Sequence, residues 1–332
     1  MIIATDGYSP AMAHGTHDYV QDPRNRDIVI RINDELRPRQ EAVVSVFDSG
    51  FMLGDGVWEG IRVLRGQLLF ADQHLTRLYE GAKAIDLDIG RTPAELVSMM
   101  HETLEANAMR PAPNGTDSIH VRLMVSRGVK STPYQDPRFT ITDPTIVIIA
   151  EYKSPLPETS TQGMSLFTVH VRRGRPDVLD PSLNTHSKLN CITACIQAAK
   201  AGADEALMLD PQGFVATCNS THFFIARGRE VWTSTGDYCL AGITRSNVLR
   251  CSEQLGLTAR QKNFSLADVY SAEEAFVTGT FAGLAPVGSV DGRTIGSGGR
   301  GPITERLQQA YIELCNESAT AMAAVDAGGV GQ

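Results

Sequence analysis

Several short stretches in the first half of the chain either alternate hydrophobic and polar residues with a period of two or form apolar runs of strand length. Both patterns are typical of β-strands. Together they predict strands at residues 28–33, 43–47, 57–64, 67–70, 119–126 and 145–152. Two other stretches space apolar residues three or four positions apart, which predicts helices at 72–85 and 93–107. The first half is therefore expected to be an α+β unit with antiparallel pairing.

A segment that follows neither period separates this half from the rest of the chain. Residues 153–162 contain Pro155, Pro157 and several small polar side chains, so we expect an interdomain linker there. Beyond it, the patterns predict strands at 165–172, 205–209, 214–218 and 222–226 and helices at 190–201 and 243–255. The expected organisation is a small domain over 1–152 with an extended arm at 1–25, a larger domain over 163–318, and a flexible tail over 319–332.

Composition narrows the class of protein. The chain has 332 residues, of which 42% are hydrophobic and 20% charged, as in globular proteins with a sizeable core. Its net charge of −8 gives no electrostatic reason to bind nucleic acid or an anionic membrane. No apolar run has the length of a membrane span, and the first residues lack the basic start of a signal peptide. We therefore expect a cytoplasmic location.

The six cysteines all lie in the second half and form no Cys-x-x-Cys pair. Cys191 and Cys195 are four positions apart, so a helix would put them on one face. No histidines at ligand spacing lie nearby, so buried free thiols are expected and no metal site is predicted.

A glycine-dense segment, 48–56, leads directly into an apolar stretch of strand length that carries Glu59 and Arg62. Glycines at this density let backbone pass close to a ligand, which favours the wall of a small-molecule site. An ordinary β-hairpin with a glycine turn explains the same pattern.

Lys188 is the lysine whose surroundings favour chemistry. It lies in an uncharged segment, 184–190, at the entrance of an apolar helix. A lysine there can be desolvated, its pKa lowered, and its amine used as a nucleophile toward an aldehyde. The alternative is a lysine that caps a turn.

Arg122 is a charged residue within a predicted strand. Alternation puts His120, Arg122 and Met124 on one face of that strand. A charge on a buried sheet needs a partner, which could be a substrate carboxylate or an internal salt bridge.

The motifs and their order resemble the class IV (fold type IV) pyridoxal-phosphate aminotransferases. That family includes branched-chain and D-amino acid transaminases, R-selective amine transaminases and aminodeoxychorismate lyase. The resemblance covers roughly residues 40–315 and rests on segments 54–62, 73–78, 242–245 and 278–280 together with Lys188. It implies a smaller N-terminal α/β sandwich, a larger β-barrel-like domain with helices, and a homodimer that builds its site across the interface.

The resemblance also implies residue roles. Lys188 would form the Schiff base with pyridoxal phosphate and move the proton between Cα and C4′. The other implied cofactor-binding residues are Arg77, Thr217, Gly242, Ile243, Thr244, Gly279 and Thr280. The implied substrate-binding residues are Leu53, Trp58, His120, Arg122 and Phe281. Without the family, Arg77 would be read as a surface helix arginine and residues 242–244 as a helix N-cap.

Three positions depart from the family pattern. Thr217 stands where the family has a glutamate that keeps the pyridine nitrogen protonated. Leu53 stands where branched-chain enzymes have a tyrosine, and Arg122 is followed by leucine rather than proline. The stretch from Lys188 to Glu205 is also about one helical turn shorter than usual.

The expected activity is transfer of an amino group between an amino acid or amine and a 2-oxo acid. Three alternatives stay open. Thr217 raises a pyridoxal-phosphate lyase or racemase, and the arm segment 18–23 is similar to R-selective amine transaminases. The third is a cofactor-binding protein without turnover.

Overall fold

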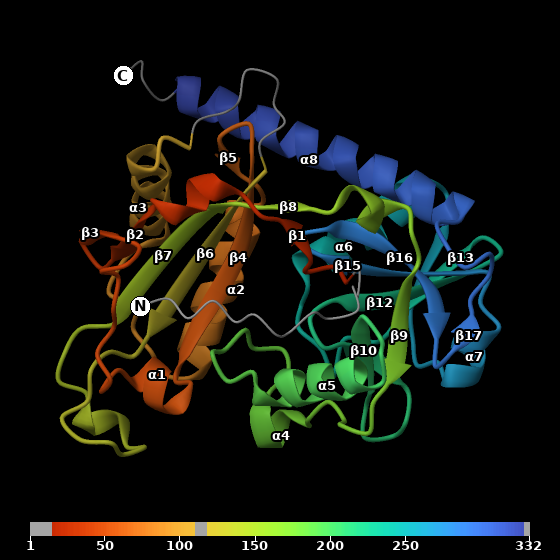
Figure 1. The fold of residues 1–332 in the computed structure, drawn as a ribbon, viewed down its shortest axis with the longest axis horizontal. Helices are drawn as coiled ribbons and strands as arrows, with labels where there is room; N and C mark the ends of the chain where they lie inside the picture. Colours follow the sequence, from red (N-terminus) through yellow and green to blue (C-terminus); the bar gives the residue numbers. More distant parts are fainter. Residues whose placement is uncertain (1–14, 110–117, 329–332) are drawn as a thin grey trace.

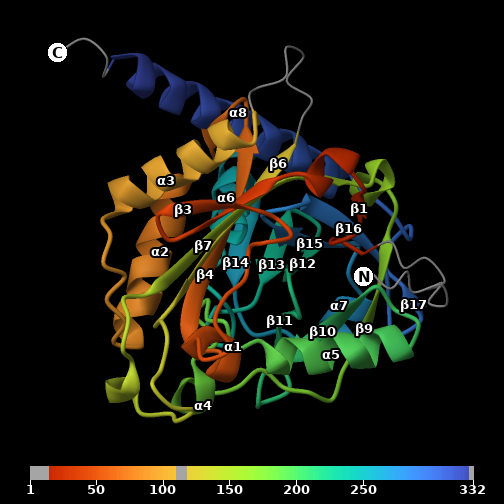
Figure 2. The same ribbon diagram turned by 60° about the vertical axis from the view of Figure 1, so that its left-hand side comes forward.

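Two β-sheets organise the protein, whose computed structural model describes residues 15–109 and 118–328. The sheets lie side by side, and α8 (Pro302–Gly328) runs along both (Figure 1). Within the described residues, one sheet has six strands and the other nine. A short pair, β1 (Tyr19–Val20) and β8 (Ser154–Pro155), lies between them (Figures 1 and 2). The α+β class expected from the sequence is confirmed.

The six-stranded sheet comes from the first half of the chain. Its order is β3 (Glu35–Pro38), β2 (Val29–Ile32), β7 (Thr145–Tyr152), β6 (Ile119–Ser126), β4 (Gly56–Leu64) and β5 (Gln67–Leu68). All neighbours pair antiparallel. The alternation of apolar residues in β6 and the apolar run of β7 explain why their predicted bounds match the observed ones.

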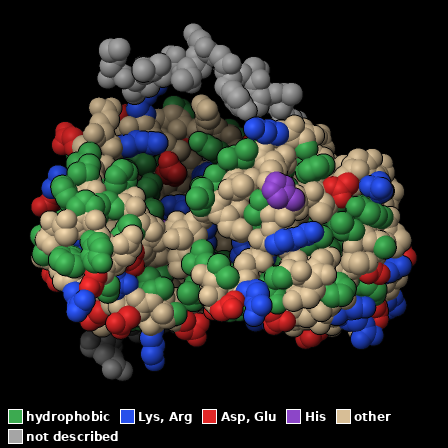
Figure 3. Space-filling view, turned by 90° about the horizontal axis from the view of Figure 1, so that it is seen from below, with side chains coloured by type: hydrophobic (Ala, Val, Ile, Leu, Met, Phe, Trp, Pro, Cys, Tyr) green, Lys and Arg blue, Asp and Glu red, His purple; other side chains and the backbone are tan. Residues whose placement is uncertain are grey.

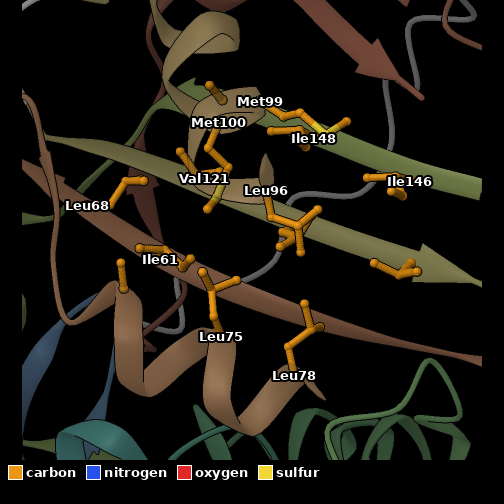
Figure 4. Packing of buried hydrophobic residues seen from close by; sticks show 14 of the residues in the cluster. Ile61, Leu68, Leu75, Leu78, Leu96, Met99, Met100, Val121, Ile146 and Ile148 are labelled. Carbon is orange, nitrogen blue, oxygen red and sulfur yellow. The ribbon is translucent and has the colours of Figure 1, made fainter. Parts of the chain in front are cut away.

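Two helices cover one face of this sheet, α2 (Ala71–Ala84) and α3 (Pro93–Ala106). Figure 4 shows the core between them, where Ile61 from β4 and Ile148 from β7 meet Leu75, Leu78 and Met100 from the helices. Each of these side chains is at most 3% exposed. The core fixes α2 against β4, which matters for the site because both elements carry site residues.

The larger sheet comes from the second half. Its order is β11 (Val215–Cys218), β10 (Glu205–Leu209), β9 (Met164–Thr168), β16 (Gly283–Val290), β15 (Glu274–Gly279), β12 (His222–Arg227), β13 (Glu230–Thr233) and β14 (Thr258–Gln261), and β17 (Arg293–Thr294) pairs with β16. The helices of this half are α4 (Pro176–Leu179), α5 (Leu189–Lys200), α6 (Ile243–Gln254) and α7 (Leu266–Tyr270). Short 3₁₀ turns occur at η1 (Pro23–Arg26), η2 (Pro137–Phe139) and η3 (Pro157–Ser160).

Helix α3 begins where the sequence predicts. The hydroxyl of Thr92 accepts a hydrogen bond from the amide of Glu95, and the Glu95 carboxylate accepts one from the amide of Thr92. Pro93 follows at the first helical position, where its missing N–H costs nothing. Helix α2 begins at Ala71, one residue before its predicted start.

The predicted strand at 43–47 is wrong. The segment pairs with no strand, and Val43 and Val46 are 69% and 67% exposed. The glycine-dense segment that follows is not the hairpin turn that the sequence left open. It forms the short helix α1 (Ser49–Leu53), which Asp48 caps and which Gly54 ends at φ 69°. Apolar alternation predicts a strand only where a neighbour supplies hydrogen bonds.

The end of the chain differs from its expected form. A flexible tail is predicted over 319–332, but α8 continues to Gly328, because its alanines are strong helix formers. Residues 329–332 lie outside the described residues. Of the parts of the chain that the structure describes, none is a helix long and apolar enough to cross a membrane.

Candidate active site

A cavity of about 480 Å³ opens between the two sheets. It brings together almost all of the residues that the sequence singled out from distant parts of the chain. Those that line it are Trp58, Arg77, His120, Arg122, Lys188, Thr217, Gly242, Ile243, Thr244, Gly279, Thr280 and Phe281. Figure 3 shows this side of the molecule hollowed between its two halves.

Lys188 is positioned by a backbone segment from the larger half that runs along β4. The amide of Trp58 donates to the carbonyl of Asn184 at 3.0 Å, and the amide of His186 donates to the carbonyl of Gly56 at 2.9 Å. The side chain of Asn184 donates to the Trp58 carbonyl at 2.6 Å. These bonds fix residues 184–187, and Lys188 follows at once as the N-cap of α5.

The Lys188 amine sits in partly desolvated surroundings. Burial lowers its pKa to about 8, and the nearby cations Arg173 and Arg77 add to the effect. Cys191 and Glu59 act in the opposite direction but do not outweigh burial. A much larger fraction of this amine is therefore neutral near pH 7 to 8 than for an exposed lysine, which is the state a nucleophile needs.

Arg77 is held in place by a fully buried carboxylate. Glu59 accepts from Arg77 Nε at 2.8 Å and from Nη2 at 2.7 Å, and His74 Nδ1 lies 2.7 Å from the same carboxylate. Burial alone would raise the pKa of Glu59, but the hydrogen bonds from His74 and Arg77 outweigh it and the pKa is lowered. Arg77 Nη1 donates to the carbonyl of Ala241 at 2.7 Å. Two of its five N–H donors remain for a ligand.

The N-terminus of α6 lies next to Arg77 in the cavity wall. Gly242 is its N-cap and no side chain caps the helix, so the first backbone amides are left for another acceptor. A Cβ at Gly242 would collide with the ring of His222, which explains the glycine. The Thr278 hydroxyl also belongs to the cavity lining, is buried, and has no hydrogen-bond partner among the described residues. Arginine, helix N-terminus and hydroxyls together fit a phosphate group.

Thr217 is buried in the wall on the large-domain side. Its hydroxyl donates to the carbonyl of Thr221 at 2.7 Å. The one hydroxyl proton is therefore committed, and only the oxygen lone pairs remain to face a ligand. No Asp or Glu is found among the described residues that line the cavity.

The opposite wall is aromatic and basic. Arg122 Cζ lies 4.2 Å from the centre of the Trp58 ring, and the His120 ring meets Phe281 edge to face at 6.1 Å. Burial lowers the pKa of His120 to about 3, and the charges of Arg122 and Lys153 add to this, so the imidazole is neutral near pH 7. Arg122 forms no salt bridge to any described carboxylate, so the internal ion pair considered from the sequence is not observed.

Leu53 is the exception among the expected substrate-binding residues. It ends α1, is 39% exposed, and does not line the cavity of its own chain. The structure also adds residues to the cavity that the patterns did not single out, among them His17, Lys153, Arg173 and Thr278. For these added residues, the only signal in the sequence is that Lys153 and Arg173 are basic. Their position at the cavity depends on the packing of the two halves, which a local pattern does not show.

No group of three or more His, Cys, Asp or Glu side chains in the described part of the chain is arranged to hold a metal ion. All six cysteines are free, and Cys191, Cys195 and Cys218 line the cavity. Cys191 accepts a hydrogen bond from Arg173 Nη1 at 3.1 Å.

The chain belongs to the class IV aminotransferase family, whose model matches residues 56–290. It is 38% identical over 296 residues to branched-chain-amino-acid aminotransferase-like protein 2 of Arabidopsis thaliana, covering 89% of this chain and 52% of that protein. It is 37% identical to a putative branched-chain-amino-acid aminotransferase of Methanocaldococcus jannaschii, covering 86% of this chain and 96% of that protein. The chain therefore spans about half the length of the Arabidopsis relative.

The fold is also similar to a solved structure. The branched-chain aminotransferase of the thermophilic archaeon Thermoproteus uzoniensis, solved with norvaline, matches with a TM-score of 0.77 and 27% identity, covering 88% of this chain and 96% of that chain. This likeness confirms the fold type IV architecture that the sequence resemblance implies.

The lowered pKa of Lys188 leads to a testable pH dependence. In cofactor-free protein, about half of the Lys188 amine should be neutral at pH 8, against less than about 1% for an ordinary lysine. Acetylation of Lys188 by limiting acetic anhydride, followed across pH by mass spectrometry, should have a midpoint near pH 8. The same peptide in urea-denatured protein should have a midpoint near about 10.4. Equal midpoints in the two states would contradict the desolvation.

The buried carboxylate of Glu59 should matter for stability. Glu59→Gln removes the charge that compensates Arg77 and should lower the free energy of unfolding by about 3–5 kcal/mol. Urea denaturation measures the loss. The matched control is Glu35→Gln, which removes an exposed ion pair with Arg37 and should change stability by less than about 1 kcal/mol. Losses of similar size would show that the Glu59 network is no more than a surface pair.

Proposed function

We propose that this protein is a pyridoxal-phosphate-dependent aminotransferase, branched-chain-like, that moves an amino group between an amino acid and a 2-oxo acid. The observation that carries the proposal is that one cavity contains a desolvated amine, Lys188, and a group of hydrogen-bond donors suited to a phosphate, from Arg77 and the N-terminus of α6. Membership of the class IV family supports it. The relatives named above carry branched-chain aminotransferase names, which supports the substrate class.

The cavity residues would have two roles: several of them would hold the cofactor, and Lys188 would transfer the proton. The free N–H groups of Arg77 and the first amides of α6 would hold the phosphate, with the Thr278, Thr244 and Thr280 hydroxyls beside them. Pyridoxal phosphate, when bound, supplies the aldehyde that takes up the amino group and the ring that withdraws electrons. The neutral amine of Lys188 would accept the proton from the substrate Cα and deliver it to C4′ of the cofactor, on the other side of the amino nitrogen.

Thr217 would give this site an electronic character different from that of relatives with a glutamate. Its hydroxyl proton points to Thr221, and no acid lines the cavity among the described residues. The described cavity lining therefore supplies no carboxylate to contact a protonated pyridine nitrogen. Proton transfer would then depend more on Lys188 and less on delocalisation into the ring.

The substrate wall would accept an apolar side chain and a carboxylate. Trp58 and Phe281 offer aromatic faces, and Arg122 offers a guanidinium without a carboxylate partner among the described residues. A carboxylate can therefore form charge-assisted hydrogen bonds to Arg122. This feature favours an amino acid over a simple amine as the donor.

A spectroscopic experiment tests the proposed function. With wild-type holoenzyme, a branched-chain amino acid should convert bound pyridoxal phosphate to pyridoxamine phosphate, and the 2-oxo acid should reverse the absorbance change. Lys188→Ala should slow the conversion at least about a hundredfold, because the proton-transfer group is gone. Lys200→Ala, on the exposed last turn of the same helix, is the matched control.

Other products would identify the alternatives. Ammonia release or a racemised amino acid without pyridoxamine phosphate would favour a lyase or racemase. Conversion by simple amines alone would favour an amine transaminase. Cofactor binding without any conversion would leave only a binding protein. Borohydride reduction should attach the cofactor to the Lys188 peptide, and attachment to Lys200 instead would end the assignment.

We also propose that the protein forms a homodimer in the cytoplasm. The six free cysteines support a reducing compartment. Large apolar side chains are exposed on α1 and the segment before it, with Phe51 70% exposed. Along α5, Leu189, Ile192 and Ile196 form one exposed face. These elements belong to the side of the molecule in Figure 3, where hydrophobic side chains gather in several areas.

A second copy would also explain the position of Leu53. This residue lies outside its own cavity on exposed α1. In a dimer built across the site, as the family resemblance implies, α1 of one copy would bring Leu53 to the cavity of the other. An exposed apolar surface of this kind is typical of an interaction site.

Sedimentation equilibrium tests the dimer. The wild type should have about twice the chain mass of 35.9 kDa. Phe51→Glu should shift it toward the monomer, because the charge would be buried in the interface. Ile312→Glu replaces a side chain of comparable exposure, 52%, on α8 and should leave the mass unchanged. A monomeric wild type, or equal effects of both variants, would contradict an interface at α1.

A further inference from the structure

One wall of the cavity carries two cations that have no acidic partner in the described part of the protein. Arg122 and Lys153 both line the cavity, and no described carboxylate forms an ion pair with either. Arg122 rests on the Trp58 ring at 4.2 Å, and Lys153 Nζ lies 4.8 Å from the centre of the Phe281 ring. An aromatic face attracts a cation weakly but does not neutralise it.

Lys153 is held in this position by the junction between the two halves. Its amide donates to the carbonyl of Ser118 at 2.8 Å, where β7 ends. The next two residues form β8, which pairs with Tyr19 and Val20 of the arm. In addition, Lys153 Nζ lies 4.7 Å from the centre of the Tyr19 ring. The lysine is therefore fixed at the cavity rather than free in a linker.

The two cations oppose each other electrostatically. Burial lowers the pKa of Lys153, and the charge of Arg122 lowers it further. Glu151 is the acid that acts in the opposite direction on both, but it is engaged with Arg39 at 3.4 Å and does not line the cavity. Two like charges in partly desolvated surroundings are unfavourable unless an anion joins them.

The positions of the cations relative to the reactive amine differ. Lys188 Nζ lies 5.6 Å from the Trp58 ring, the same ring that Arg122 covers. Lys153 belongs to the neighbouring group of Phe281 and Tyr19 instead. Arg122 therefore shares a ring with the amine of Lys188, whereas Lys153 belongs to a different pair of rings in the same cavity.

We propose that Lys153 is a specificity-determining residue that binds the second carboxylate of a dicarboxylate substrate, a short 2-oxo diacid or its amino acid. Arg122 binds the first carboxylate. The proposal rests on the proposed aminotransferase function, since that reaction brings two different substrates into one cavity in turn. The aromatic faces serve the apolar substrate, and Lys153 serves the diacid.

The test compares two acceptors of similar length, 2-oxoglutarate and 2-oxohexanoate, with holoenzyme. Lys153→Met keeps the length and apolar stem of the side chain but removes its charge. The ratio of kcat/KM for the diacid to that for the monoacid should fall about tenfold or more. Lys153→Arg keeps a cation and should restore the ratio to within about threefold of wild type.

Two controls separate this idea from its alternatives. Lys262→Met removes a lysine that also lies over an aromatic ring, Trp232 at 3.9 Å, but not in the cavity, and should leave the ratio unchanged. Calorimetric titration of the holoenzyme with glutarate, which cannot react, should show binding weakened about tenfold or more in Lys153→Met. An unchanged ratio and unchanged glutarate binding would overturn the role of Lys153. Failure of the wild type to use any acceptor would instead overturn the aminotransferase function, and glutarate binding would still report on Lys153.

Discussion

The hydrogen bonds between residues 184–187 and the start of β4 are the interaction on which the site depends. They join a loop of the larger half to a strand of the smaller half, with Asn184 bonded to Trp58 through both backbone and side chain. Because backbone groups bond on both sides, the position of the loop is set by β4 and not by flexible side chains. Lys188 is the first residue beyond this loop, so the same hydrogen bonds fix its position.

The same strand organises the end of the cavity that is proposed to hold the phosphate. Alternate residues of β4 point to opposite faces, so Trp58 faces the cavity while Glu59 faces α2. Glu59 binds Arg77 and His74 from α2, and Arg77 reaches Ala241 just before α6. One strand therefore positions Trp58, Lys188 and Arg77, the residues proposed to form the aromatic wall, to react and to bind phosphate.

Charge balance gives the cavity its chemical character. The described lining contains basic side chains and no acid, and the fully buried Glu59 behind the wall compensates Arg77. No lining carboxylate among the described residues balances the remaining positive charge, which favours a phosphate and carboxylates over neutral or cationic ligands. Thr217 fits this picture, because it supplies an oxygen without a charge at the place where the family resemblance implies a glutamate.

The sequence by itself determined the elements with clear periodicity, such as β6 and α3, the apolar run of β7, and the motif residues around Lys188. Local patterns sufficed because each face is decided by residues two or four positions away. Only the tertiary structure decided that residues 43–47 form no strand, that Leu53 lies outside its own cavity, and that Lys153 lies inside it. These outcomes depend on partners more than a hundred residues apart along the chain, such as Tyr19 with Pro155 and Val57 with Thr185. No local pattern contains that information, because packing between the two halves creates it.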